Sequence, residues 1–426
     1  MPNLIQLTDS YKLSHFNQYP DGTEKVSSYM EARGGVYPAT IFFGLQYYLK
    51  EYLSRPIDIE DVAEAAELAE RHGVPFNSKD WEIIAKEGGK LPLEIKAVKE
   101  GNLYPTGTVL MTIENTDERF PWLTNYVETL LMKVWYPTTV ATKAYYVRQV
   151  LEGAYKKSSD SDDVSFSYHN FGDRGSSSVE SALIGGMAHL TQFSGTDNFN
   201  SVEAADKYYD LKKGWSIIAT EHSTVTSWGR ENEFDFYNHY LESNKGEAII
   251  ACVMDSYDIY KAVDYITTGE FKTKVESDDY PIFVVRPDSG EPSKVLGKLL
   301  EIMEKNEVAY TTNSKGYKVF DKYRFIWGDG IDPKVILWLA NFIINKGYSA
   351  ENLAFGSGGD LMQKVDRDTC KFAIKASAAK VNGQWRDVFK DPATDTGKRS
   401  KAGLLTDSVG LVTVFKNGVR ICNTVL

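Results

Sequence analysis

Short apolar runs alternate with helical patterns from about residue 164 onward, and this alternation constrains the fold more than any other feature of the chain. Strands that alternate with helices predict βα units and a parallel sheet. About seven such runs predict an irregular (β/α) barrel, with an open doubly wound sheet as the alternative that the pattern leaves. The runs cover residues 164–168, 215–219, 248–253, 282–285, 323–326, 353–355 and 371–374, and the helical patterns between them include 179–190, 258–266, 293–304 and 333–345.

Polar and glycine-rich residues follow the first six runs, directly where each strand is expected to end. The carboxyl ends of parallel strands meet on one side of a barrel or sheet, and ligands bind there. One such segment alone would be uninformative, but six in succession predict an active site at that mouth. The segments are Asn170-Phe-Gly-Asp-Arg-Gly, Glu221-His-Ser-Thr, Asp255-Ser-Tyr-Asp, Arg286-Pro-Asp-Ser-Gly, Gly328-Asp-Gly and Gly356-Ser-Gly-Gly.

Two of these segments suit phosphate and sugar chemistry. The glycines around Gly358 and Gly359 let backbone N–H groups approach a phosphate, although such a segment alone is equally an ordinary tight turn. Arg286 suits a phosphate oxygen, and Asp288 suits a sugar hydroxyl or Mg²⁺. The alternative for this pair is a surface salt bridge that caps the turn.

Asp255 and Asp329 add carboxylates at neighbouring strand ends, which are the hard oxygen ligands that Mg²⁺ prefers. A lone histidine such as His222 is more often structural, but its place among five other polar strand ends favours a base, a donor or a phosphoryl acceptor. Asp197 is either a turn residue or the acceptor of a hydrogen bond from a ligand.

The first 160 residues mix helices with short strands. Residues 57–90 are expected to be helical with a break near Gly73, and 123–135 are expected to form a buried helix that Pro137 stops. Short strands are expected at 93–99 and 108–113. A basic segment at 388–401 is either a solvated loop or a phosphate clamp.

Composition excludes several classes of protein. A net charge of −11 makes the chain a poor partner for nucleic acid, so any phosphate must bind in a local pocket of opposite sign. No run approaches the length of a membrane span, and the first residues do not read as a signal peptide. Three cysteines without a CxxC spacing predict a cytoplasmic protein without thiolate metal sites.

Read together, the segments resemble the nicotinamide phosphoribosyltransferase family, in family order and over nearly the whole chain. The resemblance implies a homodimer with shared active sites, and an irregular (β/α) barrel of the type II phosphoribosyltransferase kind. It also implies a β-rich domain formed from both chain ends, with an N-terminal helical part. The expected divisions are 1–160, 161–375 for the barrel, and 376–426 as a segment that returns to the β-rich domain. The matching stretches are Thr8-Asp-Ser-Tyr-Lys, Phe42-Phe-Gly-Leu-Gln-Tyr, Trp135-Tyr-Pro-Thr-Thr-Val-Ala-Thr, Gly195-Thr-Asp, Phe389-Lys-Asp-Pro and the strand-end segments given above.

The resemblance implies the transfer of a phosphoribosyl group to nicotinamide, with Mg²⁺ as cofactor and ATP as a facultative co-substrate. Phe171 and, from the other subunit, Tyr11 would hold the pyridine ring between them, while His222 would accept a phosphoryl group from ATP. The Mg²⁺ is expected at Asp255 and Asp288. The other implied substrate-binding residues are Asp9, Arg174, Asp197, Arg286, Gly328, Asp329, Gly358, Gly359, Arg33, Arg367, Lys375, Lys390 and Lys398.

Asp197 decides the expected substrate. Its carboxylate would accept a hydrogen bond from the amide of nicotinamide and would repel the carboxylate of nicotinate. Two positions depart from the animal enzymes, since Asp173 replaces a tyrosine and Ala373 replaces a phosphate-contacting serine. The alternatives are a nicotinate phosphoribosyltransferase and a catalytically silent binding protein of the same fold.

Overall fold

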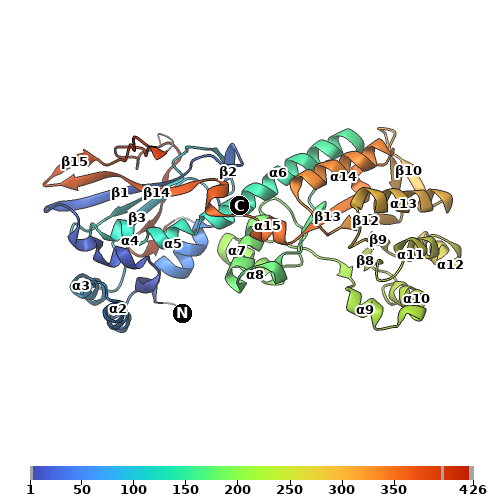
Figure 1. Cartoon of the computed structure of the whole chain (residues 1–426), viewed down its shortest axis with the longest axis horizontal. Coiled ribbons are helices and arrows are strands. Elements are labelled where there is room, and N and C mark those ends of the chain that lie inside the picture. Colours follow the sequence, from blue (N-terminus) through green and yellow to red (C-terminus); the bar gives the residue numbers. More distant parts are fainter. Residues whose placement is uncertain (1–2, 395–397, 422–426) are drawn as a thin grey trace. The chain divides into compact units, whose positions relative to one another are not determined.

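A computed structural model describes residues 3–394 and 398–421, which form two compact units (Figure 1). The first unit comprises 1–142, 204–211 and 365–426, and the second comprises 143–203 and 212–364. The expected boundaries near 160 and 375 differ from these, because the long helix α6 (Trp135–Ser158) carries the chain from one unit into the other. Cys422 and residues 395–397 of the basic segment lie outside the described residues.

The second unit is built on a parallel sheet of six strands in the order β6-β13-β12-β9-β8-β7. Every neighbouring pair in this sheet is parallel, so all six carboxyl ends lie at the same edge. The apolar residues of β8, β9, β12 and β13 are mostly buried, as strands covered on both faces require, whereas both residues of β7 are exposed. The strands are β6 (Tyr168–Asn170), β7 (Ile218–Ala219), β8 (Ile249–Val253), β9 (Ile282–Arg286), β12 (Tyr323–Trp327) and β13 (Leu353–Ser357).

Isolated bridges continue the sheet from β6 back toward β7. Asn170 pairs with Thr196, and Gly195 pairs with Trp215, which lies just before β7 in the chain. The curled parallel sheet thus continues beyond β6 through single-residue bridges, which make this part of the barrel irregular. The predicted irregular (β/α) barrel is therefore confirmed.

Helices follow the strands as the βα pattern predicts. Ser178 caps α7 (Val179–Leu190) in a capping box, and Asp332 caps α14 (Pro333–Asn345), whose first residue is a proline. Both helices have the predicted bounds. The remaining helices of this part of the chain are α8 (Phe199–Tyr209), α9 (His222–Thr226), α10 (Glu233–Ser243), α11 (Ile259–Ile266), α12 (Gly269–Val275), α13 (Pro292–Lys305) and α15 (Gly359–Gln363), and a hairpin is formed by β10 (Tyr310–Thr312) and β11 (Lys318–Phe320).

The first unit contains an antiparallel sheet of seven strands, in the order β15-β14-β1-β5-β3-β16-β17. Three strands from the amino-terminal part of the chain lie in its middle, and two strands from the carboxy-terminal part lie on each side of them, which confirms the β-rich domain formed from both ends. Strand β1 (Thr23–Ala32) is central and pairs with β14 (Phe372–Val381) and β5 (Met111–Asn115). The other strands are β3 (Leu93–Ala97), β15 (Gln384–Asp387), β16 (Val412–Lys416) and β17 (Val419–Arg420), with β2 (Ala39–Ile41) and β4 (Leu103–Pro105) as a separate pair.

Two sequence-based expectations are wrong in this unit. The run 371–374 belongs to β14 of the antiparallel sheet and not to the barrel, because Lys375 and its neighbours pair with β1. Pro137 does not stop a helix but lies in the first turn of α6, where its missing N–H costs no hydrogen bond.

The expected helix at 123–135 is interrupted, and the expected break near Gly73 is confirmed. Residues 123–135 divide into α4 (Leu123–Tyr126) and α5 (Glu128–Met132), and α6 begins at Trp135. Helix α2 (Ile59–His72) ends at Gly73, whose φ of 79° is the left-handed conformation of a helix cap. Helices α1 (Leu45–Tyr48) and α3 (Ser78–Lys86) complete this unit, and none of the described helices is long and apolar enough to cross a membrane.

Candidate active site

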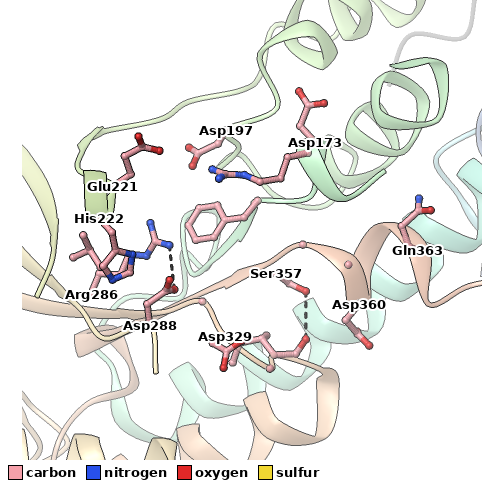
Figure 2. A pocket seen from close by; sticks show the side chains of 18 of the residues that line it. Asp173, Asp197, Glu221, His222, Arg286, Asp288, Asp329, Ser357, Asp360 and Gln363 are labelled. Carbon is pink, nitrogen blue, oxygen red and sulfur yellow. Dashed lines mark hydrogen bonds and ion pairs between the residues drawn. The ribbon is translucent and has the colours of Figure 1, made fainter. Parts of the chain in front are cut away.

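The carboxyl ends of the barrel strands surround a cavity of about 1060 Å³ (Figure 2). Most of the residues that line it come from the turns after β6, β7, β9, β12 and β13, as the strand-end segments predict, while Asp197 follows α7 and Val253 ends β8. Asp255, after β8, does not line the cavity, but its carboxylate contacts His222 and the Asp288 backbone N–H, which do. The predicted site residues that line the cavity are Phe171, Arg174, Asp197, His222, Arg286, Asp288, Gly328, Asp329, Gly358 and Gly359.

Phe171 forms a flat apolar surface at the centre of the mouth. Its backbone N–H donates to the Ser357 carbonyl at 2.9 Å, which attaches the start of the turn after β6 to β13. A Cβ at Gly356 would overlap the Phe171 ring, so glycine is required for the ring to lie against the strand. The Arg286 guanidinium carbon lies 5.5 Å from the ring centre, within the range of a cation–π contact.

Asp197 is held at the side of this surface by two hydrogen bonds. Its backbone N–H donates to the Asn170 carbonyl at 3.0 Å, and the Ser216 hydroxyl donates to its Oδ1 at 2.7 Å. Burial lowers the pKa of nearby His169, although Asp197 and the Phe166 carbonyl act in the opposite direction. A neutral His169 ring leaves the carboxylate of Asp197 without a neutralising cation on that side.

His222, Asp255 and the turn after β9 form one hydrogen-bonded network. His222 begins α9, and its Nε2 lies 3.0 Å from Oδ1 of Asp255. Oδ2 of Asp255 accepts from the Asp288 backbone N–H at 3.1 Å and from the Ser289 hydroxyl. Because an ionised carboxylate only accepts hydrogen bonds, Nε2 of His222 is the donor in this contact, and the second ring nitrogen takes no part in it.

Arg286 and Asp288 form an ion pair at 3.1 Å, which bears out the salt-bridge alternative while placing both side chains in the cavity wall. The Arg286 Nε is buried and has no hydrogen-bond partner in the part of the chain that the structure describes. The described residues contain no cluster of three or more histidine, cysteine or carboxylate ligands. Asp255 and Asp288 nevertheless fit Mg²⁺, which commonly takes one or two carboxylates and completes its shell with phosphate oxygens and water.

The glycine turn after β13 lies opposite this network. The Ser357 hydroxyl donates to the Ile331 carbonyl at 3.3 Å, and the Trp327 indole N–H donates to the Asp329 carbonyl at 2.8 Å. The first of these contacts attaches the turns after β12 and β13 to each other, and Figure 2 shows it as the dashed line from Ser357.

Six carboxylates face this cavity against three lysine or arginine side chains, so the mouth alone is unfavourable for a free polyanion.

Several lining residues were not predicted from the sequence. Asp173 and Glu221 lie inside the predicted strand-end segments, and this position in the sequence could have identified them as residues that line the cavity. The other unpredicted residues are Ser223, Val253, Gly330, Ile331, Ser357, Asp360, Gln363 and Lys364.

A separate basic pocket of about 640 Å³ lies in the first unit. Six of its lining residues are lysine or arginine, against two carboxylates, and Ala373 forms part of its wall. The side chains of this pocket carry a net positive charge, whereas those at the mouth of the barrel carry a net negative one. The predicted residues that line it are Arg33, Arg367, Lys375, Lys390 and Lys398, while Lys371 was not predicted.

Two cations of this pocket are only partly compensated by the carboxylates around them. The Arg33 Nε donates to Glu31 at 2.9 Å, but its Nη2 is buried and has no hydrogen-bond partner within the described residues. Burial lowers the pKa of Lys375; Glu128 opposes this, and the nearby Arg33 and Lys390 lower the pKa further. An anion that enters the pocket would relieve this repulsion, as phosphate does in sites built from arginine and lysine.

Asp9 and Tyr11 line neither pocket. The Thr129 hydroxyl donates to the Asp9 carboxylate at 2.6 Å, which attaches this segment to α5. Tyr11 is 59 % exposed, so one face of its ring is available to another molecule.

Two family profiles match separate parts of the chain. The sequence profile of the nicotinate phosphoribosyltransferase family matches residues 166–419, and that of the nicotinamide phosphoribosyltransferase N-terminal domain matches residues 3–95. A nicotinamide phosphoribosyltransferase of Xanthomonas campestris is 47% identical over 95% of this chain and 87% of its own length. The nicotinamide phosphoribosyltransferase of Acinetobacter baylyi is 31% identical over 95% of this chain and 88% of its own.

Solved structures with much lower sequence identity share the fold. The nicotinate-nucleotide pyrophosphorylase of Pyrococcus furiosus superposes with a TM-score of 0.58 at 14% identity, covering 99% of this chain and 92% of its own. The human nicotinic acid phosphoribosyltransferase superposes with a TM-score of 0.55 at 16% identity, covering 89% of this chain and 75% of its own.

The lowered pKa of Lys375 predicts how anion binding depends on pH. Only the protonated ammonium attracts an anion, so affinity for inorganic pyrophosphate should fall as the pH rises through a range below that of an ordinary lysine. Lys375→Arg should remove this fall because arginine stays protonated, whereas the exposed Lys86→Arg should behave as the wild type. Titration calorimetry from pH 7 to about 10 measures the affinity of each protein for pyrophosphate. Pyrophosphate has the same ionisation at a given pH whichever protein is present, so differences between the proteins come from the side chain. Parallel curves for Lys375→Arg and wild type would contradict it.

Proposed function

The chain belongs to the nicotinate phosphoribosyltransferase family, and on that premise we propose that it transfers the phosphoribosyl group of 5-phosphoribosyl 1-pyrophosphate to nicotinamide. The products are nicotinamide mononucleotide and pyrophosphate, which makes the reaction a step in NAD salvage. The observation that carries the choice of the amide is the Asp197 carboxylate, which Ser216 holds and which lines the same cavity as the Phe171 ring. It would accept a hydrogen bond from the amide NH₂ and repel a nicotinate carboxylate.

The reaction is a displacement at the anomeric carbon of the ribose. The lone pair of the pyridine nitrogen forms the new C–N bond, and pyrophosphate leaves with the electron pair of the broken C–O bond. No proton is transferred, so the protein contributes position and charge stabilisation rather than a general base. Phe171 supports the flat face of the pyridine, and Arg286 lies where it favours the departing negative charge.

Asp255 and Asp288 would hold a Mg²⁺ together with the phosphate oxygens of the donor. The metal would supply positive charge that stabilises the leaving pyrophosphate. The main-chain contact between Asp288 and Asp255 keeps the two carboxylates close to each other before the substrate binds.

His222 is suited to accept a phosphoryl group from ATP. Its hydrogen bond to Asp255 orients the ring and leaves the second ring nitrogen outside that contact, so this nitrogen could serve as the nucleophile. Phosphorylation would place negative charge beside the carboxylates that are proposed to hold Mg²⁺, and so would couple ATP hydrolysis to donor binding.

A homodimer with shared sites would supply the cations that the mouth lacks. The mouth carries the residues for the pyridine and the ribose, and the basic pocket of the first unit carries the cations for phosphate. We propose that the basic pocket and Tyr11 of one subunit complete the site of the other. Opposite net charge on the two surfaces favours this pairing.

The wild-type protein should consume nicotinamide and not nicotinate when each is supplied with the donor and Mg²⁺. Asp197→Asn removes the repelling charge and should raise kcat/KM for nicotinate by about tenfold to a hundredfold. It should also lower kcat/KM for nicotinamide by about tenfold, because the amide loses a charged acceptor. Turnover of nicotinate by the wild type would instead identify a nicotinate phosphoribosyltransferase, and turnover of neither would indicate a silent binding protein.

His222→Ala should abolish the stimulation of turnover by ATP while leaving slower ATP-independent synthesis, since the pyridine attack itself needs no histidine. Product formation with and without ATP measures this, together with the release of phosphate from ATP. The exposed His72→Ala is the matched control. ATP stimulation that persists in His222→Ala would contradict the phosphohistidine.

Shared sites predict complementation between two inactive variants. Arg286→Ala damages the mouth and Lys375→Ala damages the basic pocket, so each homodimer should be nearly inactive. After subunit exchange, half of the dimers would be mixed, and each mixed dimer would have one intact site. The mixture should therefore recover about a quarter of the wild-type activity. A mixture no more active than the two variants measured apart would show that each site is built from one subunit.

A further inference from the structure

We propose that Lys143 is a positioning residue that neutralises Asp360, so that the glycine turn beside it can bind phosphate. Asp360 directly follows Gly358 and Gly359 and lines the cavity of the mouth. A carboxylate at that place repels a phosphate, and the structure provides a buried cation that compensates for it. The proposal deepens the proposed function, because it concerns binding of the phosphoribosyl donor at the same site.

The Lys143 ammonium contacts Asp360 in two ways. Its Nζ lies 2.5 Å from the Asp360 carboxylate and donates to the Asp360 carbonyl at 2.6 Å. The first contact cancels charge, and the second fixes the backbone at the end of the turn. Asp360 lies in the first turn of α15, and Figure 2 shows it at the edge of the pocket.

Burial makes this pair stronger than an ordinary surface salt bridge. The side chains of Lys143 and Asp360 are 7% and 11% exposed, so water screens their interaction little. Lys143 lies on α6, which fixes the position of the ammonium. The other nearby cation, Lys364, lies 3.9 Å from the carboxylate and is 75% exposed, so it cannot replace Lys143.

Charge compensation and simple structural support predict different results for the two partners. If the pair only supports the fold, removing either side chain should weaken phosphate binding in the same direction. If Lys143 cancels the charge of Asp360, removing Lys143 exposes a negative charge to the phosphate, whereas neutralising Asp360 leaves a positive one. The effects of the two substitutions should then have opposite signs.

The test uses the full-length protein with Lys143→Met, Asp360→Asn and the double variant, and Lys157→Met at the exposed end of α6 as the control. KM is measured for the donor and for nicotinamide, and calorimetry measures the affinity for inorganic phosphate. Thermal unfolding of each variant shows whether it folds. Lys143→Met should raise KM for the donor about tenfold and weaken phosphate to a similar extent, with KM for nicotinamide changed less than about twofold.

Asp360→Asn should bind donor and phosphate at least as tightly as the wild type, and the double variant should return to within about threefold of it. Weaker binding by Asp360→Asn, or unchanged binding by Lys143→Met, would overturn the proposal. If Lys143→Met does not fold, the comparison moves to the double variant, which must bind phosphate more weakly than Asp360→Asn. If the wild type turns over neither pyridine, the proposed function fails, while the phosphate titrations still test the pair.

Discussion

The parallel pairing of the barrel strands is the constraint on which the site depends. Residues far apart in sequence meet because parallel strands place all their carboxyl ends at one edge. His222 therefore reaches Asp255, and Asp255 reaches the backbone of Asp288, across three successive strand ends. An antiparallel sheet of the same strands would place alternate turns at opposite ends and separate these groups. The chemistry is possible only because the backbone hydrogen bonds of the sheet fix this order.

The sequence predicted those features that depend on local pattern. Helices α7 and α14 have the expected bounds because Ser178 and Pro333 mark their starts and apolar periodicity defines their length. The strand-end segments were found because polar residues after an apolar strand are conspicuous. The residues around Phe171 could be placed at the mouth for the same reason, but the contact of its ring with Gly356 required the structure.

Features that depend on distant partners could not be read from the sequence. The run 371–374 has the pattern of a barrel strand, but pairing with β1 places it in the antiparallel sheet. The sequence around Pro137 is compatible with a proline that ends one helix and with a proline in the first turn of the next. Only the course of α6 in the structure shows that the second applies. Ser216 and Lys143 carry no motif, because their roles come from Asp197 and Asp360, which are far away in the chain.

Two carboxylates in the mouth show how the same group acquires different functions. Asp197 is oriented by a neutral hydroxyl, and the adjacent His169 is kept uncharged by burial, so its charge acts on whatever enters the cavity. Asp360 is paired with a buried ammonium, so little of its charge reaches the cavity. A site that must exclude a carboxylate on the pyridine and accept phosphates on the ribose needs both arrangements. On these proposals, selectivity would follow from which carboxylates are compensated, because the number of acidic side chains alone would exclude both kinds of anion.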